Sequence, residues 1–223
     1  MNIFETSDGS HSLHSDRFEV AYHSKHGAVQ ETRHVFLEAG LAHRWSCDPV
    51  RVLGVGFGTG LNAFMTLLEA QRTGRQVHYE TIEAFPISPD LAESLNFAEI
   101  LGVPEKRGDF LRLHTEAWGH EIEFDRFHFK KHRIRLEEFS GTDRFDVIYF
   151  DAFAPNAQPE LWEATIFQNM YRLLRPGGVL TTYCAKGVVK RTLRAVGFEV
   201  EALPGPPGKR EMTRAMRPAL KTT

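Results

Sequence analysis

The sequence predicts an α/β fold in which helices cover both faces of a mostly parallel β-sheet. Apolar, strand-like segments alternate with amphipathic helical segments along most of the 223 residues, an order typical of parallel βαβ units. The segment 50–55 also runs directly into a glycine-rich turn and then a helical pattern, which is how such a unit begins. The length suits one domain with an ordinary hydrophobic core.

The individual elements follow from residue type and spacing. Strands are expected where short runs of β-branched and aromatic residues occur, at 50–55, 77–83, 132–136, 145–151, 179–184, 198–203 and 211–215. Helices are expected where apolar residues recur at helical spacing, over 60–71, 88–101, 159–174 and 187–196. The predicted sheet therefore has seven strands.

Two further segments define the domain organisation. Residues 1–48 mix polar turns with alternating runs such as 18–22, which predict a small N-terminal β-hairpin appendage. Residues 49–223 are expected to form the main domain, and residues 102–131 are interpreted as an insertion that holds a short helix and strand-like pieces.

Composition limits the partners and the cellular compartment that can be expected for this chain. The net charge of −2 gives no sign of a nucleic-acid or membrane partner, and no apolar run approaches the roughly 20 residues of a membrane helix. Two cysteines form no disulfide framework and the first residues lack signal-peptide features, so a cytoplasmic protein is expected. The pairs His11/His14 and His23/His26 lack a helical H-E-x-x-H context, so surface histidines and no metal are predicted.

The glycine-rich turn indicates the class of ligand. Its pattern is Gly-x-Gly-x-Gly, and the third glycine of the dinucleotide fingerprint would fall on Leu61. No phosphate-binding Walker pattern is present either. The turn therefore favours S-adenosylmethionine, although a merely tight strand-to-helix turn stays open. The residues expected to bind this cofactor are Gly56, Phe57, Gly58, Thr59, Gly60 and Asn62.

Two acidic residues end predicted parallel strands, where ligands bind in such sheets. Glu83 closes the second strand and can accept hydrogen bonds from ribose hydroxyls; Glu80 is the competing choice two residues earlier. Asp151 closes the fourth strand and precedes the segment 152–155. This position suggests a residue at the reacting centre, with a helix N-cap as the alternative.

Basic residues gather toward the end of the chain. From position 186 onward there are nine basic residues and three acidic ones. The basic residues are Lys186, Lys190, Arg191, Arg194, Lys209, Arg210, Arg214, Arg217 and Lys221. A second cluster is found at 130–135. Such clusters bind polyanions or form a solvated basic face, and the sequence leaves both alternatives open.

Several blocks in this order resemble one family. They are the segments 8–10, 22–24, 31–37, 56–62, 83–86, 150–155, 159–162, 175–178 and 209–212. The chain resembles the methyltransferase half of the bifunctional tRNA 5-methylaminomethyl-2-thiouridine modification enzyme and its stand-alone relatives. The resemblance implies a class I S-adenosylmethionine-dependent methyltransferase fold, Rossmann-like, with a mostly parallel seven-stranded sheet and a small N-terminal β appendage.

The resemblance also implies a reaction. It is N-methylation of 5-aminomethyl-(2-thio)uridine at the wobble position of tRNA, with the anticodon loop as partner. The match does not include the flavin half, so removal of a carboxymethyl group is expected of a separate upstream tRNA-modifying enzyme. Asp151 is expected to orient the amine and take its proton, and to contact the cofactor.

The remaining site residues are assigned on the same basis. Phe153 is expected to stack on the uracil and Tyr22 to wall the pocket, while Lys209 and Arg210 meet the RNA backbone. Glu211 is expected to orient Arg210.

Two further positions concern how the cofactor is bound. Glu137, with Glu138 as runner-up, is expected to bind the adenine amino group. Gly54 stands where the family often has an acid that helps to hold the cofactor's amino group.

Rival interpretations remain. An aminopropyltransferase of the spermidine synthase type shares the fold, but the segment 151–156 offers one acid where that class usually has more. A non-catalytic RNA-binding protein on a decayed methyltransferase fold is the other alternative, because Gly54 removes a cofactor contact. A nicotinamide oxidoreductase is disfavoured by the missing third glycine.

Overall fold

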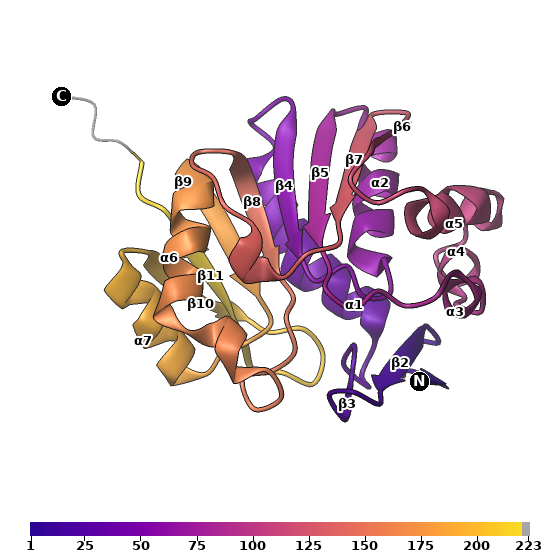
Figure 1. Ribbon diagram of the computed structural model, residues 1–223, viewed down its shortest axis with the longest axis horizontal. Coiled ribbons are helices and arrows are strands. Elements are labelled where there is room, and N and C mark those ends of the chain that lie inside the picture. Colours follow the sequence, from indigo (N-terminus) through magenta and orange to yellow (C-terminus); the bar gives the residue numbers. More distant parts are fainter. Residues whose placement is uncertain (220–223) are drawn as a thin grey trace.

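A computed structural model describes residues 1–219 and confirms the α/β fold (Figure 1). Within these residues the main sheet has eight strands in the order β10-β11-β9-β8-β4-β5-β7-β6. They are β4 (Val50–Val55), β5 (Val77–Ile82), β6 (Glu121–Phe124), β7 (Phe127–His132), β8 (Phe145–Phe150), β9 (Leu174–Thr182), β10 (Glu199–Pro204) and β11 (Glu211–Met216). The five strands from β9 to β7 are parallel, whereas β6, β10 and β11 pair antiparallel.

Helices cover both faces of this sheet. The longer ones are α2 (Leu61–Thr73), α5 (Arg107–Thr115), α6 (Ala164–Leu173) and α7 (Gly187–Val196). The cluster of buried side chains that includes α2 and α5 lies on one face, and the cluster that includes α6 and α7 lies on the other. Figure 1 shows α6 and α7 together beside β9, and α2 and α5 near β7.

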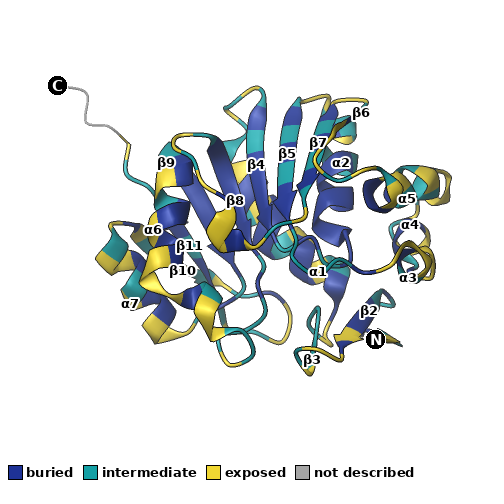
Figure 2. Ribbon diagram, viewed as in Figure 1, coloured by how far each residue is buried: buried dark blue, intermediate teal, exposed yellow. Residues whose placement is uncertain are grey.

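Strand β8 shows how the two faces are built. Val147 and Tyr149 belong to the first cluster, and Ile148 and Phe150 belong to the second. Because successive side chains of a strand point to opposite faces, a strand buried on both sides has a continuous apolar run. All six residues of β8 are buried (Figure 2). The prediction of a strand at 145–151 rested on its β-branched and aromatic residues, and it is confirmed for residues 145–150.

The N-terminal region differs in part from the prediction. It begins with a small antiparallel sheet of β1 (Asn2–Glu5), β2 (His11–Ser15) and β3 (Val20–Ala21). Helical structure follows, as α1 (Ala28–Thr32), the π-helix η1 (Arg33–Leu41) and η2 (Ala42–Arg44). The sequence analysis read only turns and hairpin strands here, which is wrong for the helical stretch.

The missed helical stretch packs on the main sheet. Val35, Phe36 and Leu41 of η1 are fully or almost fully buried in the cluster that includes Tyr149 of β8. The ring centroids of Phe36 and Tyr149 are 5.1 Å apart. This packing brings the N-terminal region against the strands that carry the candidate site.

The third predicted strand is shifted. It was placed at 132–136, but the structure has β7 at Phe127–His132. Every second residue of this strand points into the interior, and Phe127, Phe129 and Lys131 are all 0% exposed. Because one of these three buried residues is a lysine, the sequence does not show the apolar alternation expected of a strand. Strand β6 adds a hairpin to β7, so the sheet has eight strands in place of the seven predicted.

Two predicted helices are divided. The stretch 88–101 holds α3 (Pro89–Glu93) and α4 (Phe97–Ile100), separated at residues 94–96. The stretch 159–174 begins with the 3₁₀ turn η5 (Pro159–Trp162), and α6 starts afterwards. Two more 3₁₀ turns are η3 (Pro104–Lys106) and η4 (Leu136–Glu138). Among residues 1–219, no helix has the length and apolar character needed to cross a membrane.

Candidate functional site

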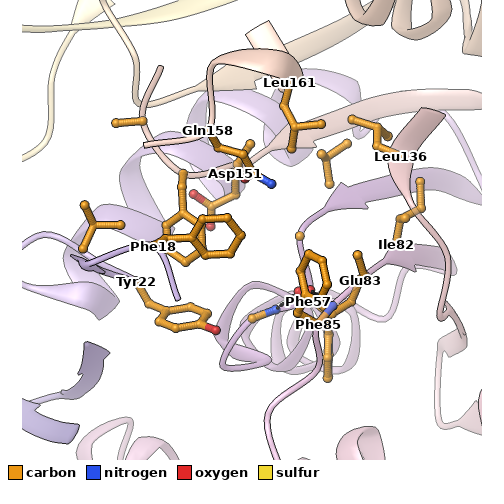
Figure 3. Close-up of a pocket in the computed structure, with 18 of the residues that line it drawn as sticks. Phe18, Tyr22, Phe57, Ile82, Glu83, Phe85, Leu136, Asp151, Gln158 and Leu161 are labelled. Atoms are coloured by element: carbon orange, nitrogen blue, oxygen red, sulfur yellow. Dashed lines mark hydrogen bonds between the residues drawn. The ribbon is translucent and has the colours of Figure 1, made fainter. Parts of the chain in front are cut away.

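A cavity of about 330 Å³ lies at the carboxyl ends of β4, β5 and β8 (Figure 3). The residues after β4 form its floor, and residues 17–24 of the N-terminal region close one side. Lys209, in the loop between β10 and β11, also reaches it. Ligands of doubly wound sheets bind at this edge, and the volume lies in the range of small-molecule pockets.

The glycines after β4 are required by shape. Gly56, Gly58 and Gly60 have φ values of 87°, 52° and 78°, a region that favours glycine. A Cβ on Gly56 would lie 3.0 Å from the backbone oxygen of Asp151, and one on Gly58 would lie 3.1 Å from the ring of Tyr22. Gly60 does not line the cavity but precedes α2. The glycines thus let the backbone of the loop pass close to Asp151 and Tyr22.

Glu83 holds this loop in place. Its Oε2 accepts a hydrogen bond from the amide of Gly58 at 3.0 Å, and its Oε1 accepts one from the amide of Phe85 at 2.8 Å. Glu80 instead accepts hydrogen bonds from Arg144 at 2.7 Å and from His132 at 2.8 Å. Of the two acids considered from the sequence, Glu83 is the one that lines the cavity.

Asp151 is held from behind by an amide. The Nδ2 of Asn62 donates to its Oδ2 at 2.7 Å, and the Oδ1 of Asn62 accepts from the Thr32 hydroxyl at 2.8 Å. Asp151 is half-buried, with one side on the cavity. Burial, and then the negative charge of Glu31, raise its pKa to about 7, against the Asn62 hydrogen bond and the positive charge of Lys209.

Glu31 and Lys209 form an ion pair inside the cavity, between Oε1 and Nζ. Glu31 is 8% exposed, and its Oε2 accepts from the amide of Ser24 at 3.0 Å. The sequence analysis assigned Glu31 no role, because its helix was missed. Lys209 was expected on the RNA backbone, but the structure places it in the cavity, with Nζ 4.1 Å from the ring centroid of Tyr183.

Aromatic side chains form the rim of the cavity. The ring of Phe153 lies 4.8 Å from that of Phe18 and 5.0 Å from that of Tyr22, centroid to centroid. Phe85 lies 6.1 Å from Phe18, and the guanidinium of Arg17 stacks 3.8 Å above Phe85. Figure 3 shows Phe18 and Tyr22 on one side of the cavity and Phe85 on the other. Phe153 and Tyr22 were expected here, whereas Phe18 and Phe85 were not.

The other predicted site residues do not all lie on the cavity. Arg210 is exposed, and Glu211 does not orient it, because its Oε2 accepts a hydrogen bond from Lys190 at 2.7 Å. Glu137 lines the cavity, and Glu138 lines a shallow hollow beside it. Lys221 lies outside the described residues.

Gly54 is explained by its neighbours. A Cβ at this position would lie 2.6 Å from the hydroxyl of Tyr79 and 3.0 Å from the hydroxyl of Thr81. Tyr79 is 2% exposed. The space that an acidic side chain would need is therefore occupied by the phenol of the neighbouring strand.

The histidines were predicted at the surface, which is wrong for His23. It lines the cavity, bonds to the hydroxyls of Ser12 at 3.1 Å and Thr59 at 3.3 Å, and burial lowers its pKa to about 4. His14 and His26 are exposed. Within the described part of the chain, no group of three or more His, Cys, Asp or Glu side chains is arranged to hold a metal ion.

The comparisons with known proteins agree with this geometry. The family described as "S-adenosyl-L-methionine-dependent methyltransferase" matches residues 105–218. The chain belongs to this methyltransferase family. It is homologous over about 90% of its length to the methyltransferase part of proteins named tRNA 5-methylaminomethyl-2-thiouridine biosynthesis bifunctional protein MnmC.

Individual relatives show the extent of the likeness. The protein from Marinomonas sp. is 31% identical over 90% of this chain and 32% of its own length. That from Delftia acidovorans is 33% identical over 91% and 33%, respectively. This methyltransferase chain thus spans about a third of its curated relatives. The crystal structure of MnmC2 from Aquifex aeolicus superposes with a TM-score of 0.76 at 24% identity, over 98% of this chain and 70% of that one.

The cavity fits the cofactor of the methyltransferase family. The glycine loop lets the backbone border the cavity closely just before α2, and Glu83, the residue after β5, lies at the cavity with lone pairs left for ribose hydroxyls. The acid often found at position 54 is absent. S-adenosylmethionine is the cofactor of this family.

Proposed function

We propose that this methyltransferase transfers a methyl group from S-adenosylmethionine to the primary amine of 5-aminomethyl-(2-thio)uridine at the wobble position of tRNA. The observation that carries the proposal is Asp151, a carboxylate that lies on the cavity beside the aromatic ring of Phe153. The MnmC relatives are named for the biosynthesis of the methylated nucleoside. The tRNA anticodon loop is the proposed partner.

Each part of the cofactor has candidate partners. S-adenosylmethionine supplies an electrophilic methyl carbon when it is bound. Gly56, Gly58 and Asn62 line the cavity, and we place the amino-acid part of the cofactor beside them. The Gly58 amide already donates to Glu83, and one hydrogen of the Asn62 side-chain amide is taken by Asp151, so the second hydrogen of that amide and the close approach of the glycine backbone are what this part of the loop offers. Glu83 is placed for the ribose, and Glu137 lies at the end where the adenine is proposed. No carboxylate at position 54 takes part, so backbone groups hold the amino group.

Asp151 has the geometry of a proton acceptor. Its Oδ2 is occupied by Asn62, while Oδ1 has no hydrogen-bond donor among residues 1–219. An amine must be neutral to attack, because its lone pair forms the new bond. The Oδ1 atom accepts a hydrogen bond from the amine, aims the lone pair, and then takes the proton. A pKa of about 7 suits this task near neutral pH.

The rim supplies the contacts to the nucleobase. Phe153 and Phe18 present flat apolar surfaces, on which single-stranded bases commonly stack. The hydroxyl of Tyr22 points into the cavity in Figure 3 and closes it below the rim. Arg17 stands at the mouth and is exposed, so it is available to a phosphate of the anticodon loop. Base stacking and phosphate contact together exclude water from Asp151.

A spermidine synthase-like activity is the second candidate, because the acid Glu31 lies on the cavity near Asp151. Lys209 pairs with that acid, which weakens the case for a polyamine substrate. Methyl transfer from labelled S-adenosylmethionine to tRNA with and without the wobble aminomethyl group tests the proposal. Label on the amine-bearing tRNA alone, lost in Asp151→Ala and kept in the exposed control Asp90→Asn, supports it.

Two other outcomes would favour a different function. Cofactor binding without transfer to either tRNA contradicts the tRNA substrate, and transfer from decarboxylated S-adenosylmethionine to putrescine is then measured. Absence of cofactor binding, with tRNA still bound, supports the non-catalytic RNA-binding alternative.

A further inference from the structure

An internal ion pair stands beside the proposed proton acceptor. Glu31 comes from α1 and Lys209 from the loop between β10 and β11, 178 residues later in the chain. Both side chains line the cavity that Asp151 borders. The contact joins the N-terminal region to a loop near the other end of the chain, so it does not serve to stabilise a single helix or turn.

The pair is held in one arrangement from both sides. The amide of Ser24 donates to Glu31, and the ammonium of Lys209 lies 4.1 Å from the ring centroid of Tyr183. The Tyr183 hydroxyl donates to the backbone oxygen of Ala152 at 2.9 Å, next to Asp151. Exposed ion pairs contribute little because their side chains are mobile and solvated, but this pair is 8% and 30% exposed.

Four groups act electrostatically around Asp151. They are Glu31 on α1, Lys209 in the β10–β11 loop, Tyr183 after β9 and Tyr79 on β5. Burial raises the pKa of both phenols, which therefore stay neutral at physiological pH. The charged neighbours of Asp151 in this set are thus one acid and one base, whose effects on it have opposite signs.

We propose that Lys209 determines specificity by cancelling the charge of Glu31, so that the cavity accepts a neutral amine and rejects ammonium and polyamine cations. The inference rests on the proposed function, in which an amine is the acceptor. With the pair intact, the charge of Glu31 is neutralised by Lys209, and the carboxylate of Asp151 is left to face the amine. Without Lys209, two carboxylates would bind a cation and keep the amine protonated, and a protonated amine has no lone pair with which to attack.

Three variants separate this charge effect from a structural role. Lys209→Met removes the positive charge and keeps a chain of similar length. Glu31→Gln removes the negative charge and keeps an acceptor for the amide of Ser24. The double variant restores neutrality. Lys190→Met is the matched control, because Lys190 is similarly paired, with Glu211, but does not line the cavity.

The first readout is spermidine binding by calorimetry at pH 7.5. We expect Lys209→Met to bind spermidine at least about tenfold more tightly than wild type. The double variant and Lys190→Met return to the wild-type value. Equal spermidine affinity in wild type and Lys209→Met would overturn the inference. This readout needs no methyl transfer, so it judges the inference separately from the proposed function.

The second readout is the pH profile of methyl transfer. Lys209→Met is expected to lower kcat/KM about fivefold at pH 7 and to approach wild type above about pH 9, because its acid limb moves up by about one pH unit. Glu31→Gln moves the limb the opposite way, and the double variant lies between. A pH-independent loss in Lys209→Met, uncorrected in the double variant, means that Lys209 only binds RNA or holds its loop, which contradicts the inference.

Discussion

Replacement of Asp151 by Asn is expected to remove activity while it stabilises the free protein. The pKa of this carboxyl is about 7 in the folded state, against an ordinary value of 3.8. The folded state therefore resists ionisation of Asp151 more than the unfolded state does. Its contribution to stability is present below the unfolded pKa and is lost as the pH rises from about 4 to about 7.

The magnitude follows from the shift. Each pKa unit corresponds to about 1.4 kcal/mol, so the three-unit shift makes ionised Asp151 cost up to about 4 kcal/mol at pH 8. An Asn at this position keeps an oxygen for the side-chain amide of Asn62 and carries no charge. We expect Asp151→Asn to be more stable than wild type by about 2–4 kcal/mol at pH 8 and about equal to it near pH 4.

Urea unfolding of the ligand-free proteins at several pH values measures this difference. A melting temperature higher by several degrees accompanies it, since about 1 kcal/mol shifts a protein of this size by roughly 2–4 °C. Methyl transfer by the same variant is expected to fall by at least about 100-fold. A variant that is no more stable at pH 8 than at pH 4, relative to wild type, would refute the reasoning about the buried carboxylate.

Three other changes test the surroundings. Gly54→Asp is expected to lose about 1–3 kcal/mol by crowding the Tyr79 hydroxyl, with part regained in the double variant with Tyr79→Phe; an unchanged melting temperature contradicts this. The pKa of His23 is lowered from 6.5 to about 4, so its contribution to stability is lost as the pH falls from about 6.5 toward 4. The unfolding free energies of wild type and His23→Gln should therefore converge by about 2 kcal/mol between pH 7 and pH 5. Lys131→Met is expected to cost about 1–3 kcal/mol, because the buried ammonium donates to the Leu113 carbonyl at 2.8 Å; equal urea midpoints would oppose that account.

Much of the fold was accessible from local patterns. The helix predicted over 187–196 has the same bounds in the structure, and the strand at 50–55 coincides with β4. These elements have strong periodicity or a clear terminal glycine, so their local signals agree with the final packing. The position of Glu83 at the end of its strand was also sufficient to prefer it to Glu80 as the residue on the cavity.

The rest depends on contacts between distant parts of the chain. Glu31 lies on a five-residue helix whose N-cap makes no side-chain hydrogen bond, so local signals for that helix are weak. Its partner Lys209 lies 178 residues away in the sequence, so no local pattern predicts the ion pair that the two form in the cavity. The third strand was misplaced for a similar reason. Lys131 is buried in this strand because its ammonium donates hydrogen bonds to backbone carbonyls near the end of α5, a contact that the local sequence does not indicate.

The central claim is methyl transfer to an amine held by Asp151. The most direct test is transfer of labelled methyl from S-adenosylmethionine to tRNA that carries 5-aminomethyluridine at the wobble position, with tRNA lacking that amine as the control. The account predicts label on the amine-bearing tRNA alone, recovered as the methylaminomethyl nucleoside and absent with Asp151→Ala. Label on both tRNAs, or on neither while the cofactor binds, would contradict it.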